Sequence, residues 1–316
     1  MSADRMVIIS EVGARDGLQT QPVHVSSADK IRMIDAFSGA GLTRVEVTSF
    51  VHPKIVPQLA DAEQVLAGIK RKPGLRYAAF VPNVKGAERA LAAGVEDFKS
   101  GIAASETFNS LNVRMTTAQA QQALRDITAA AKGSPSQVVG VLGTAFGCPY
   151  EGDMPVDRVL RLIDGMIECG LKLIYFADTT GMANPASIAA VIEPAMKRWP
   201  EVRFGLHLHN TRGLGLANAL AGLDRGGRDF ESSIGGMGGC PYAPLAVGNI
   251  CTEDFVHMLH GMGYETGLDL DALIAAARMT ESILGAKLPG MVLRAGKASE
   301  LHDADKKRDK PAAAAE

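Results

Sequence analysis

Short stretches rich in β-branched residues alternate with longer amphipathic stretches, and this alternation restricts the possible folds more than any other feature of the chain. Eight strand–helix pairs can be followed between Val7 and Gly263. The predicted strands are Val7–Glu11, Arg44–Thr48, Leu75–Phe80, Asp97–Ile102, Gln137–Leu142, Lys172–Ala177, Arg203–His207 and Phe230–Ser233. The helices predicted to follow them are Ser27–Ala40, Asp61–Lys70, Lys85–Ala93, Thr117–Lys132, Val156–Cys169, Pro185–Trp199, Leu214–Arg225 and Thr252–Gly263. A helix between two successive strands indicates parallel strands joined by right-handed crossovers.

Closure of eight such units predicts an α/β fold, the (β/α)8 TIM barrel. An open, doubly wound sheet is the alternative, but no GxGxxG fingerprint follows the first strand to favour a dinucleotide-binding fold. Leu270–Leu284 predicts an additional C-terminal helix packed outside the ring. Residues 1–297 therefore form one predicted catalytic domain. Residues 298–316, which include a basic run and a final Pro-Ala-Ala-Ala-Ala-Glu, are predicted to be a disordered tail.

The charge and hydropathy of the chain argue against nucleic acid or a membrane as a partner. There are 33 lysines and arginines against 35 acidic residues, which gives a net charge of −2. No apolar stretch approaches the ~20 residues needed to cross a bilayer, and the polar start shows no signal peptide. Four cysteines do not make a disulfide scaffold in a chain of this length. We therefore expect a cytoplasmic protein with reduced thiols.

Polar side chains gather where the predicted strands end, which is where barrels of this type carry their active sites. They follow the first, second, sixth, seventh and eighth strands. The residues are Arg15, Asp16 and Gln19 after the first strand, Glu46 and Ser49 at the second, Asp178 at the sixth, His207 and His209 at the seventh, and Cys240 and Asn249 after the eighth. Since the carboxyl ends of all strands meet at one mouth of a barrel, we expect these side chains to form one site.

His207 and His209 are two residues apart on a predicted strand, so their side chains point to the same face. Taken alone, the pair fits two hydrogen-bonded structural histidines as well as two metal ligands. An aspartate and an asparagine at other strand ends favour a metal, and such mixed nitrogen and oxygen donors suit Mg²⁺ or Mn²⁺ more than Zn²⁺. Cys240 could be a small buried hydrophobic residue. Its four glycine neighbours between Gly235 and Gly239 favour instead a mobile lid that carries a reactive thiol.

Six segments of the chain resemble the 3-hydroxy-3-methylglutaryl-CoA lyases, which are metal-dependent barrel lyases. The segments are Glu11–Gln19 (EVGARDGLQ), Val45–Val51 (VEVTSFV), Pro53–Ala62 (PKIVPQLADA), Gly147–Gly152 (GCPYEG), His207–Thr211 (HLHNT) and Gly235–Asp254 (GGMGGCPYAPLAVGNICTED). The last segment contains the glycine-rich cysteine loop that the related Claisen-type synthases usually lack. The resemblance therefore points to the lyase branch.

The resemblance implies the ligands of the metal and the groups that move protons. Asp16, His207, His209 and Asn249 would bind the divalent ion. Asp16 or His207 would take the proton of the substrate's C3 hydroxyl, and Cys240 would be the acid–base residue of the lid.

The resemblance also implies which residues hold the substrate. Arg15 would face the thioester carbonyl and stabilise an enolate, while Glu46 would hold Arg15 in place. Gln19, Ser49 and Asp178 would line the acyl-CoA site.

The implied reaction is cleavage of 3-hydroxy-3-methylglutaryl-CoA to acetyl-CoA and acetoacetate, and a homodimer or higher homo-oligomer is the expected assembly of such a barrel. The chain departs from the family pattern at Asn210 and Arg212, which stand where an aspartate and a tyrosine are usual. The acyl group therefore stays open, with citramalyl-CoA or a longer 3-substituted glutaryl-CoA as alternatives. A Claisen-type synthase and a metal-binding barrel without catalysis are the remaining alternatives.

Overall fold

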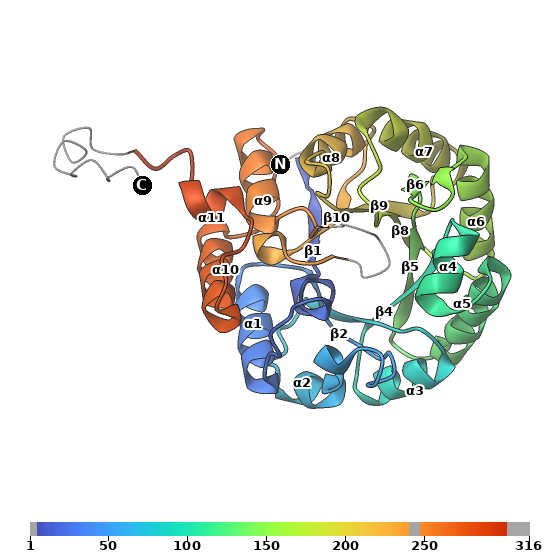
Figure 1. Cartoon of the computed structure of the whole chain (residues 1–316), viewed down its shortest axis with the longest axis horizontal. Coiled ribbons are helices and arrows are strands. Elements are labelled where there is room, and N and C mark those ends of the chain that lie inside the picture. The colour runs from blue at the N-terminus through green and yellow to red at the C-terminus, as the bar shows by residue number, and fades with distance from the viewer. Residues whose placement is uncertain (1–4, 240–246, 302–316) are drawn as a thin grey trace.

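Eight parallel strands pair edge to edge and close into a barrel in the computed structural model, which describes residues 5–239 and 247–301 (Figure 1). The strands are β1 (Ile8–Glu11), β2 (Arg44–Ser49), β3 (Arg76–Phe80), β4 (Asp97–Ala103), β5 (Gln137–Gly143), β8 (Leu173–Asp178), β9 (Arg203–Leu208) and β10 (Asp229–Ser232). Their order around the barrel is β1-β10-β9-β8-β5-β4-β3-β2, and β1 pairs with both β10 and β2. The predicted TIM barrel is confirmed, and the open sheet is excluded.

Helices follow the strands and form the outer ring (Figure 1). They are α1 (Ser27–Gly39), α2 (Ala62–Gly68), α3 (Val84–Ala92), α5 (Thr117–Ala131), α6 (Val156–Glu168), α7 (Pro185–Arg198), α8 (Gly215–Asp224) and α9 (Thr252–Gly261). Local sequence sets several of their starts. The Ser26 side chain accepts the N–H of Asp29 at the start of α1, and Asn184 forms a capping box with Ser187 directly around the Pro185 that opens α7.

The predicted additional C-terminal helix is present as α10 (Leu270–Leu284), which packs against α1 and α9 outside the ring. A short helix, α11 (Met291–Ala295), follows it and was not expected from the sequence. Residues 302–316 lie outside the described part of the chain, so the disordered tail stays a prediction. Ala298, its predicted first residue, donates its N–H to His257 of α9.

Two further elements at the barrel mouth were not predicted from the sequence. The helix α4 (Glu106–Val113) begins at Ser105, whose hydroxyl accepts the N–H of Phe108. It is only eight residues long and shows no clear apolar period, which explains why its pattern was missed. A two-stranded hairpin formed by β6 (Gly147–Cys148) and β7 (Gly152–Asp153) lies within the loop between β5 and α6.

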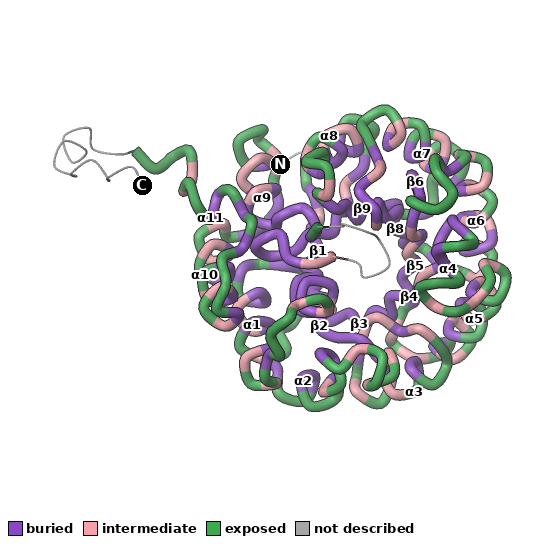
Figure 2. Tube along the Cα trace, in the orientation of Figure 1, coloured by how far each residue is buried: buried purple, intermediate pink, exposed green. Residues whose placement is uncertain are grey.

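One contiguous apolar core fills the space between the strands and the helices, and Figure 2 shows the buried residues on the inner side of the ring. The inside of the barrel is more polar, because paired charges occupy it. Near the amino-terminal end, Arg44 and Arg76 both pair with the buried carboxylate of Asp97. Among the described residues, no helix is long and apolar enough to span a membrane.

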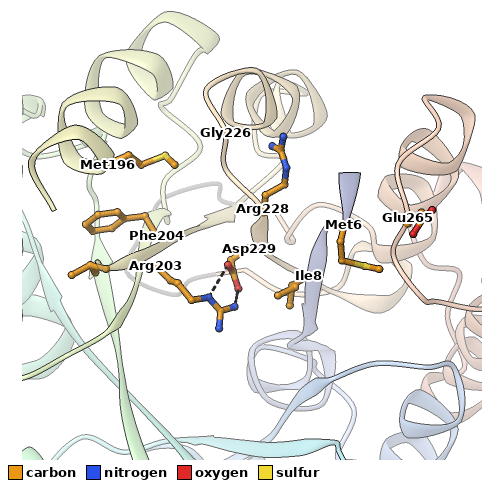
Figure 3. A pocket seen from close by; sticks show the side chains of 10 residues that line it. Met6, Ile8, Met196, Arg203, Phe204, Gly226, Arg228, Asp229 and Glu265 are labelled. Carbon is orange, nitrogen blue, oxygen red and sulfur yellow. Dashed lines mark hydrogen bonds and ion pairs between the residues drawn. The ribbon is translucent and has the colours of Figure 1, made fainter. Parts of the chain in front are cut away.

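A cavity of about 730 Å³ lies at the amino-terminal end of the barrel (Figure 3). Arg203 and Asp229 form an ion pair on its wall, next to apolar side chains such as Met196 and Phe204. Barrel enzymes place their chemistry at the opposite end, where the carboxyl ends of the strands meet. We therefore assign this cavity no part in catalysis.

Candidate active site

The carboxyl ends of the strands surround a second cavity of about 630 Å³. Five of the residues predicted from the sequence line it: Arg15, Asp16, Gln19, His207 and His209. The opposite part of its wall comes from strand residues with small side chains and from Phe108 and Asn109 of α4. Strand ends from far apart in the chain therefore meet at one mouth, as the sequence predicted.

Asp16, His207 and His209 form a compact group of possible metal ligands. A tight π-helical turn, Gly13–Gly17, follows β1 and places Asp16 at the mouth, where it is buried. The Nε2 atoms of the two histidines are 3.1 Å apart, and Asp16 Oδ2 lies 3.9 Å from His207 Nε2 and 4.0 Å from His209 Nε2. Ligand atoms bind divalent ions at about 2.0–2.2 Å, so one ion between these three atoms could reach all of them.

Asn249 completes this group from the far end of the sequence. Its Nδ2 donates to Asp16 Oδ2 over 2.8 Å and to the Met237 carbonyl over 3.2 Å. Its Oδ1 is buried and has no hydrogen-bond partner among the described residues. An orphaned buried amide oxygen beside a carboxylate and two imidazoles fits a hard divalent cation. At Gly238, a Cβ atom would come within 2.6 Å of Asn249 Nδ2, so only glycine allows the chain to pass here.

Charges around the site favour the protonation states that bind a metal. Burial would raise the pKa of Asp16, but Arg15, His207 and His209 outweigh it and hold this pKa well below its usual range. Burial, together with the neighbouring His207, lowers the pKa of His209 to about 4. At neutral pH Asp16 is therefore ionised and His209 is neutral, as ligation requires.

Glu231 of β10 was not singled out from the sequence, yet it contacts the site directly. Its Oε2 lies 2.9 Å from Nδ1 of His207, which leaves Nε2 of the ring facing Asp16. Metal-binding histidines characteristically have such a carboxylate partner on their second nitrogen. The only signal in the sequence was an acidic residue inside a strand that is otherwise buried, which does not identify its partner.

Arg15 is held on two sides by carboxylates. Its Nε and Nη2 donate to the two oxygens of Glu46 over 2.6 and 3.2 Å, and its Nη1 donates to Asp16 Oδ1 over 2.6 Å. The guanidinium also lies 5.3 Å from the centre of the Phe80 ring. Three of the five N–H groups of Arg15 are used in this way, and the other two have no partner among residues 5–239 and 247–301.

Asp178 and Ser49 are placed near the site but not on its cavity wall. Asp178 is buried at the end of β8, where its Oδ1 accepts the N–H groups of Met182 and Ala183 and its Oδ2 has no partner among the described residues. Burial raises the pKa of Asp178 to about 6. The buried Ser49 hydroxyl accepts the N–H of Val51. Their predicted contact with substrate stays a prediction.

The two departures from the family pattern take up structural positions. Arg212 donates to the carbonyls of Thr180 and Gly181, in the loop after β8, and so does not join the metal ligands. The side chain of Asn210 accepts the N–H of Gly215 at the start of α8. The added positive charge therefore supports a loop and acts on Asp178.

Cys240 lies outside the described residues, so its predicted role stays a prediction. Gly239, which precedes it, lines the cavity, and the carbonyl of Val247 lies 3.0 Å from Nδ1 of His209. Cys148 is fully buried, and its sulfur accepts the N–H of Tyr150.

Two buried carboxyl groups anchor the chain that leads into the glycine-rich loop. Glu11 of β1 accepts the N–H groups of Gly13 and Ile234, and the Thr252 hydroxyl. Glu253 accepts the N–H of Gly235. Burial raises the pKa of Glu11 to about 8 and that of Glu253 to about 7, and in the described part of the chain no cation pairs with either carboxyl.

Comparison with known proteins places this site in a familiar context. The family model described as HMGL-like matches residues 6–280. The chain is 42% identical over 299 residues to hydroxymethylglutaryl-CoA lyase YngG of Bacillus subtilis, covering 95% of this chain and all of the relative. It is 40% identical to the (R)-citramalyl-CoA lyase of Chloroflexus aurantiacus, with 92% and 95% covered. A solved HMG-CoA lyase from Acenitobacter baumannii, in complex with coenzyme A and 3-methylmalate, superposes with a TM-score of 0.92 at 40% identity, covering 96% of this chain and 99% of that one.

The raised pKa of Glu11 predicts a specific pH dependence of stability. The folded state binds this proton more tightly than the unfolded state, whose pKa is near 4.5, so the stabilisation is complete below pH 4.5 and is lost as the pH rises towards 8. Glu11→Gln keeps the shape without the charge. Between pH 5 and 8, the wild-type free energy of unfolding should fall by a few kcal/mol more than that of the variant, on the order of 1.4 kcal/mol per pKa unit. Urea unfolding at each pH measures this difference.

The matched control is Glu193→Gln on the exposed surface of α7, which should keep the wild-type pH slope. Equal slopes for Glu11→Gln and the wild type would show that Glu11 is not the titrating group.

Proposed function

Because this chain belongs to the HMGL-like family, we propose that its barrel is a carbon–carbon lyase that cleaves 3-hydroxy-3-methylglutaryl-CoA to acetyl-CoA and acetoacetate. One observation carries the proposal. A group of metal-type ligands, Asp16, His207 and His209, lies next to a fixed cation, Arg15, on the wall of a single cavity. Cleavage of a β-hydroxy thioester needs both features, because one end of the breaking bond loses a proton and the other receives an electron pair.

Asp16, His207, His209 and Asn249 fit a divalent ion, and we infer Mg²⁺ or Mn²⁺ from their mixed nitrogen and oxygen atoms. Such an ion, when bound, supplies Lewis acidity that lowers the pKa of a substrate hydroxyl. Oxygen-rich sites with two imidazoles hold their ion less firmly than thiolate cages, so the ion should be removable.

The proton of the C3 hydroxyl goes to a side chain within this same group of residues. Asp16 and His207 are the two candidates, and the low pKa of Asp16 makes its carboxylate the weaker base. Glu231 Oε2 lies 2.9 Å from Nδ1 of His207 and so leaves Nε2 of the ring to face the site, which favours the imidazole as the base. The single free lone pair on Nε2 cannot serve an ion and a proton at once. Asp16, His207, His209 and Asn249 would hold the ion in the free enzyme, and His207 would take the proton once substrate is bound.

The electron pair of the broken C2–C3 bond moves into the thioester, which becomes the enolate of acetyl-CoA, while C3 becomes the ketone of acetoacetate. The two free N–H groups of Arg15 stabilise the negative enolate oxygen. Glu46 and Asp16 hold the guanidinium before the reaction begins, so little reorganisation is needed. A proton delivered to C2 completes the products, and we assign that proton to the thiol of Cys240 on the resemblance of its loop.

For the acyl group of the substrate, (R)-citramalyl-CoA is the alternative that an observation favours. A relative of that name is 40% identical to this chain, close to the 42% of the hydroxymethylglutaryl-CoA lyase. Both substrates would undergo the same bond cleavage at the same groups.

We expect the purified enzyme to release acetyl-CoA fastest from 3-hydroxy-3-methylglutaryl-CoA. A coupled assay for acetyl-CoA across a panel that adds citramalyl-CoA and a longer 3-substituted glutaryl-CoA measures kcat/KM for each. A higher value for citramalyl-CoA would change the substrate and keep the chemistry. No release from any thioester, with condensation of acetyl-CoA and a 2-oxo acid instead, would establish the synthase alternative.

We expect chelation to abolish turnover and added Mn²⁺ or Mg²⁺ to restore it. In calorimetric titrations, Asp16→Asn and His209→Ala should each weaken Mn²⁺ binding by an order of magnitude or more, because each removes one ligand. His260→Ala is the control, since this histidine bonds to Thr266 on the outer ring. Full turnover by metal-free protein would contradict the assignment.

We expect Cys240→Ser to lower kcat by about two orders of magnitude, the size typical for the loss of one acid–base group, with Mn²⁺ affinity unchanged. Cys148→Ser is the matched control, because both thiols stand in a Gly-Cys-Pro-Tyr sequence and the buried Cys148 only accepts a backbone N–H. Its kcat should stay near the wild-type value. The assignment is wrong if Cys148→Ser is the inactive variant and Cys240→Ser turns over normally.

A further inference from the structure

A lysine is buried inside the barrel, one layer below the mouth. Lys99 of β4 has no exposed surface, and its Nζ lies 3.1 Å from Glu46 Oε2 and forms an ion pair with Glu231 Oε1. The same Nζ is 5.3 Å from the centre of the buried Tyr175 ring. An ammonium group without water is costly unless it is paired, so this lysine is held in place by the two carboxylates.

The two carboxylates that hold Lys99 are also those that hold the site. Glu46 accepts hydrogen bonds from Arg15 through both oxygens, while Glu231 contacts Nδ1 of His207. A continuous line of contacts therefore runs from Arg15 through Glu46, Lys99 and Glu231 to His207. Glu46, Lys99 and Glu231 come from β2, β4 and β10, which are alternate strands of the barrel and fill one interior layer.

We propose that Lys99 is a positioning residue, which fixes the distance and orientation between Arg15 and His207; this inference rests on the proposed lyase function. The two ends of the line serve opposite ends of the breaking bond, since Arg15 stabilises the enolate oxygen and His207 acts at the C3 hydroxyl. Along this line the positive charges of Arg15 and Lys99 are matched by the negative charges of Glu46 and Glu231. Without Lys99, Glu231 would lose the lysine that pairs with it and Glu46 would keep only Arg15, so each carboxylate could turn away from its present position.

The alternative is that Lys99 only fills the barrel and stabilises the fold. The barrel offers a matched control for this alternative. Arg76 pairs with the buried Asp97 one layer nearer the amino-terminal end, and neither side chain contacts a residue of the candidate site among the described contacts. Loss of that pair should cost stability without moving Arg15 or His207.

The test compares Lys99→Met, Lys99→Gln and Lys99→Arg with Arg76→Met in the full chain. We expect Lys99→Met and Lys99→Gln to lower kcat by about 10²-fold, the cost of a misplacement near 1 Å, with KM within about threefold of the wild type. Both should also weaken Mn²⁺ binding about tenfold in calorimetry, as the loss of an outer-shell partner does. Lys99→Arg, which keeps the cation, should recover most of kcat.

Arg76→Met should lower Tm while keeping kcat and Mn²⁺ affinity. The proposal is overturned if kcat of the folded Lys99→Gln variant stays within about threefold of the wild type, or if Arg76→Met loses as much kcat. If Lys99→Met fails to fold, the kcat values of Lys99→Gln and Lys99→Arg test the proposal. Should the wild type release no acetyl-CoA from any thioester, the lyase function fails by itself. In that case the Mn²⁺ affinity tests the positioning role of Lys99. Unchanged Mn²⁺ binding by Lys99→Gln would contradict that role.

Discussion

Parallel pairing of β1 with both β10 and β2 closes the sheet, and the rest of the molecule depends on that closure. It removes the free edges that an open sheet would leave, and it turns the carboxyl end of every strand to the same mouth. Asp16, which follows the first strand, and Asn249, which follows the last, lie 233 positions apart in sequence and share a hydrogen bond of 2.8 Å. No local interaction could bring these two side chains together.

Closure also creates an interior that is filled by side chains and still carries charge. Two groups of paired charges meet this constraint inside the barrel. Arg44 and Arg76 share Asp97 near the amino-terminal end, while Lys99 lies between Glu46 and Glu231 below the mouth. The first group stabilises the barrel, and the second connects to residues that face the cavity. We propose that these paired charges also orient the side chains of the candidate site before substrate arrives.

The sequence predicted the elements well where burial imposes a clear period. All eight barrel strands and the helices behind them lie within a few residues of their predicted ranges, because strands buried on both sides and helices with one apolar face leave distinct patterns. The short helix α4, the β6–β7 hairpin and α11 were missed, since each is too short to show a period. Ser49 and Asp178 accept backbone N–H groups near the site, and their predicted contact with the substrate stays a prediction.

The sequence by itself determined the barrel, its outer C-terminal helix, and the set of polar residues that follow the strands, because strand order and residue type are local properties of the chain. Only the tertiary structure decided which of these side chains meet. Glu231 and Lys99 lie in buried strands, and their local sequence does not indicate which residues they contact. Their ion pair depends on the register of strands that are not neighbours in the barrel, which closure of the sheet alone fixes. For that reason the grouping of Asp16, His207 and His209 could be predicted from the sequence, whereas the contacts of Glu231 and Lys99 behind it could not.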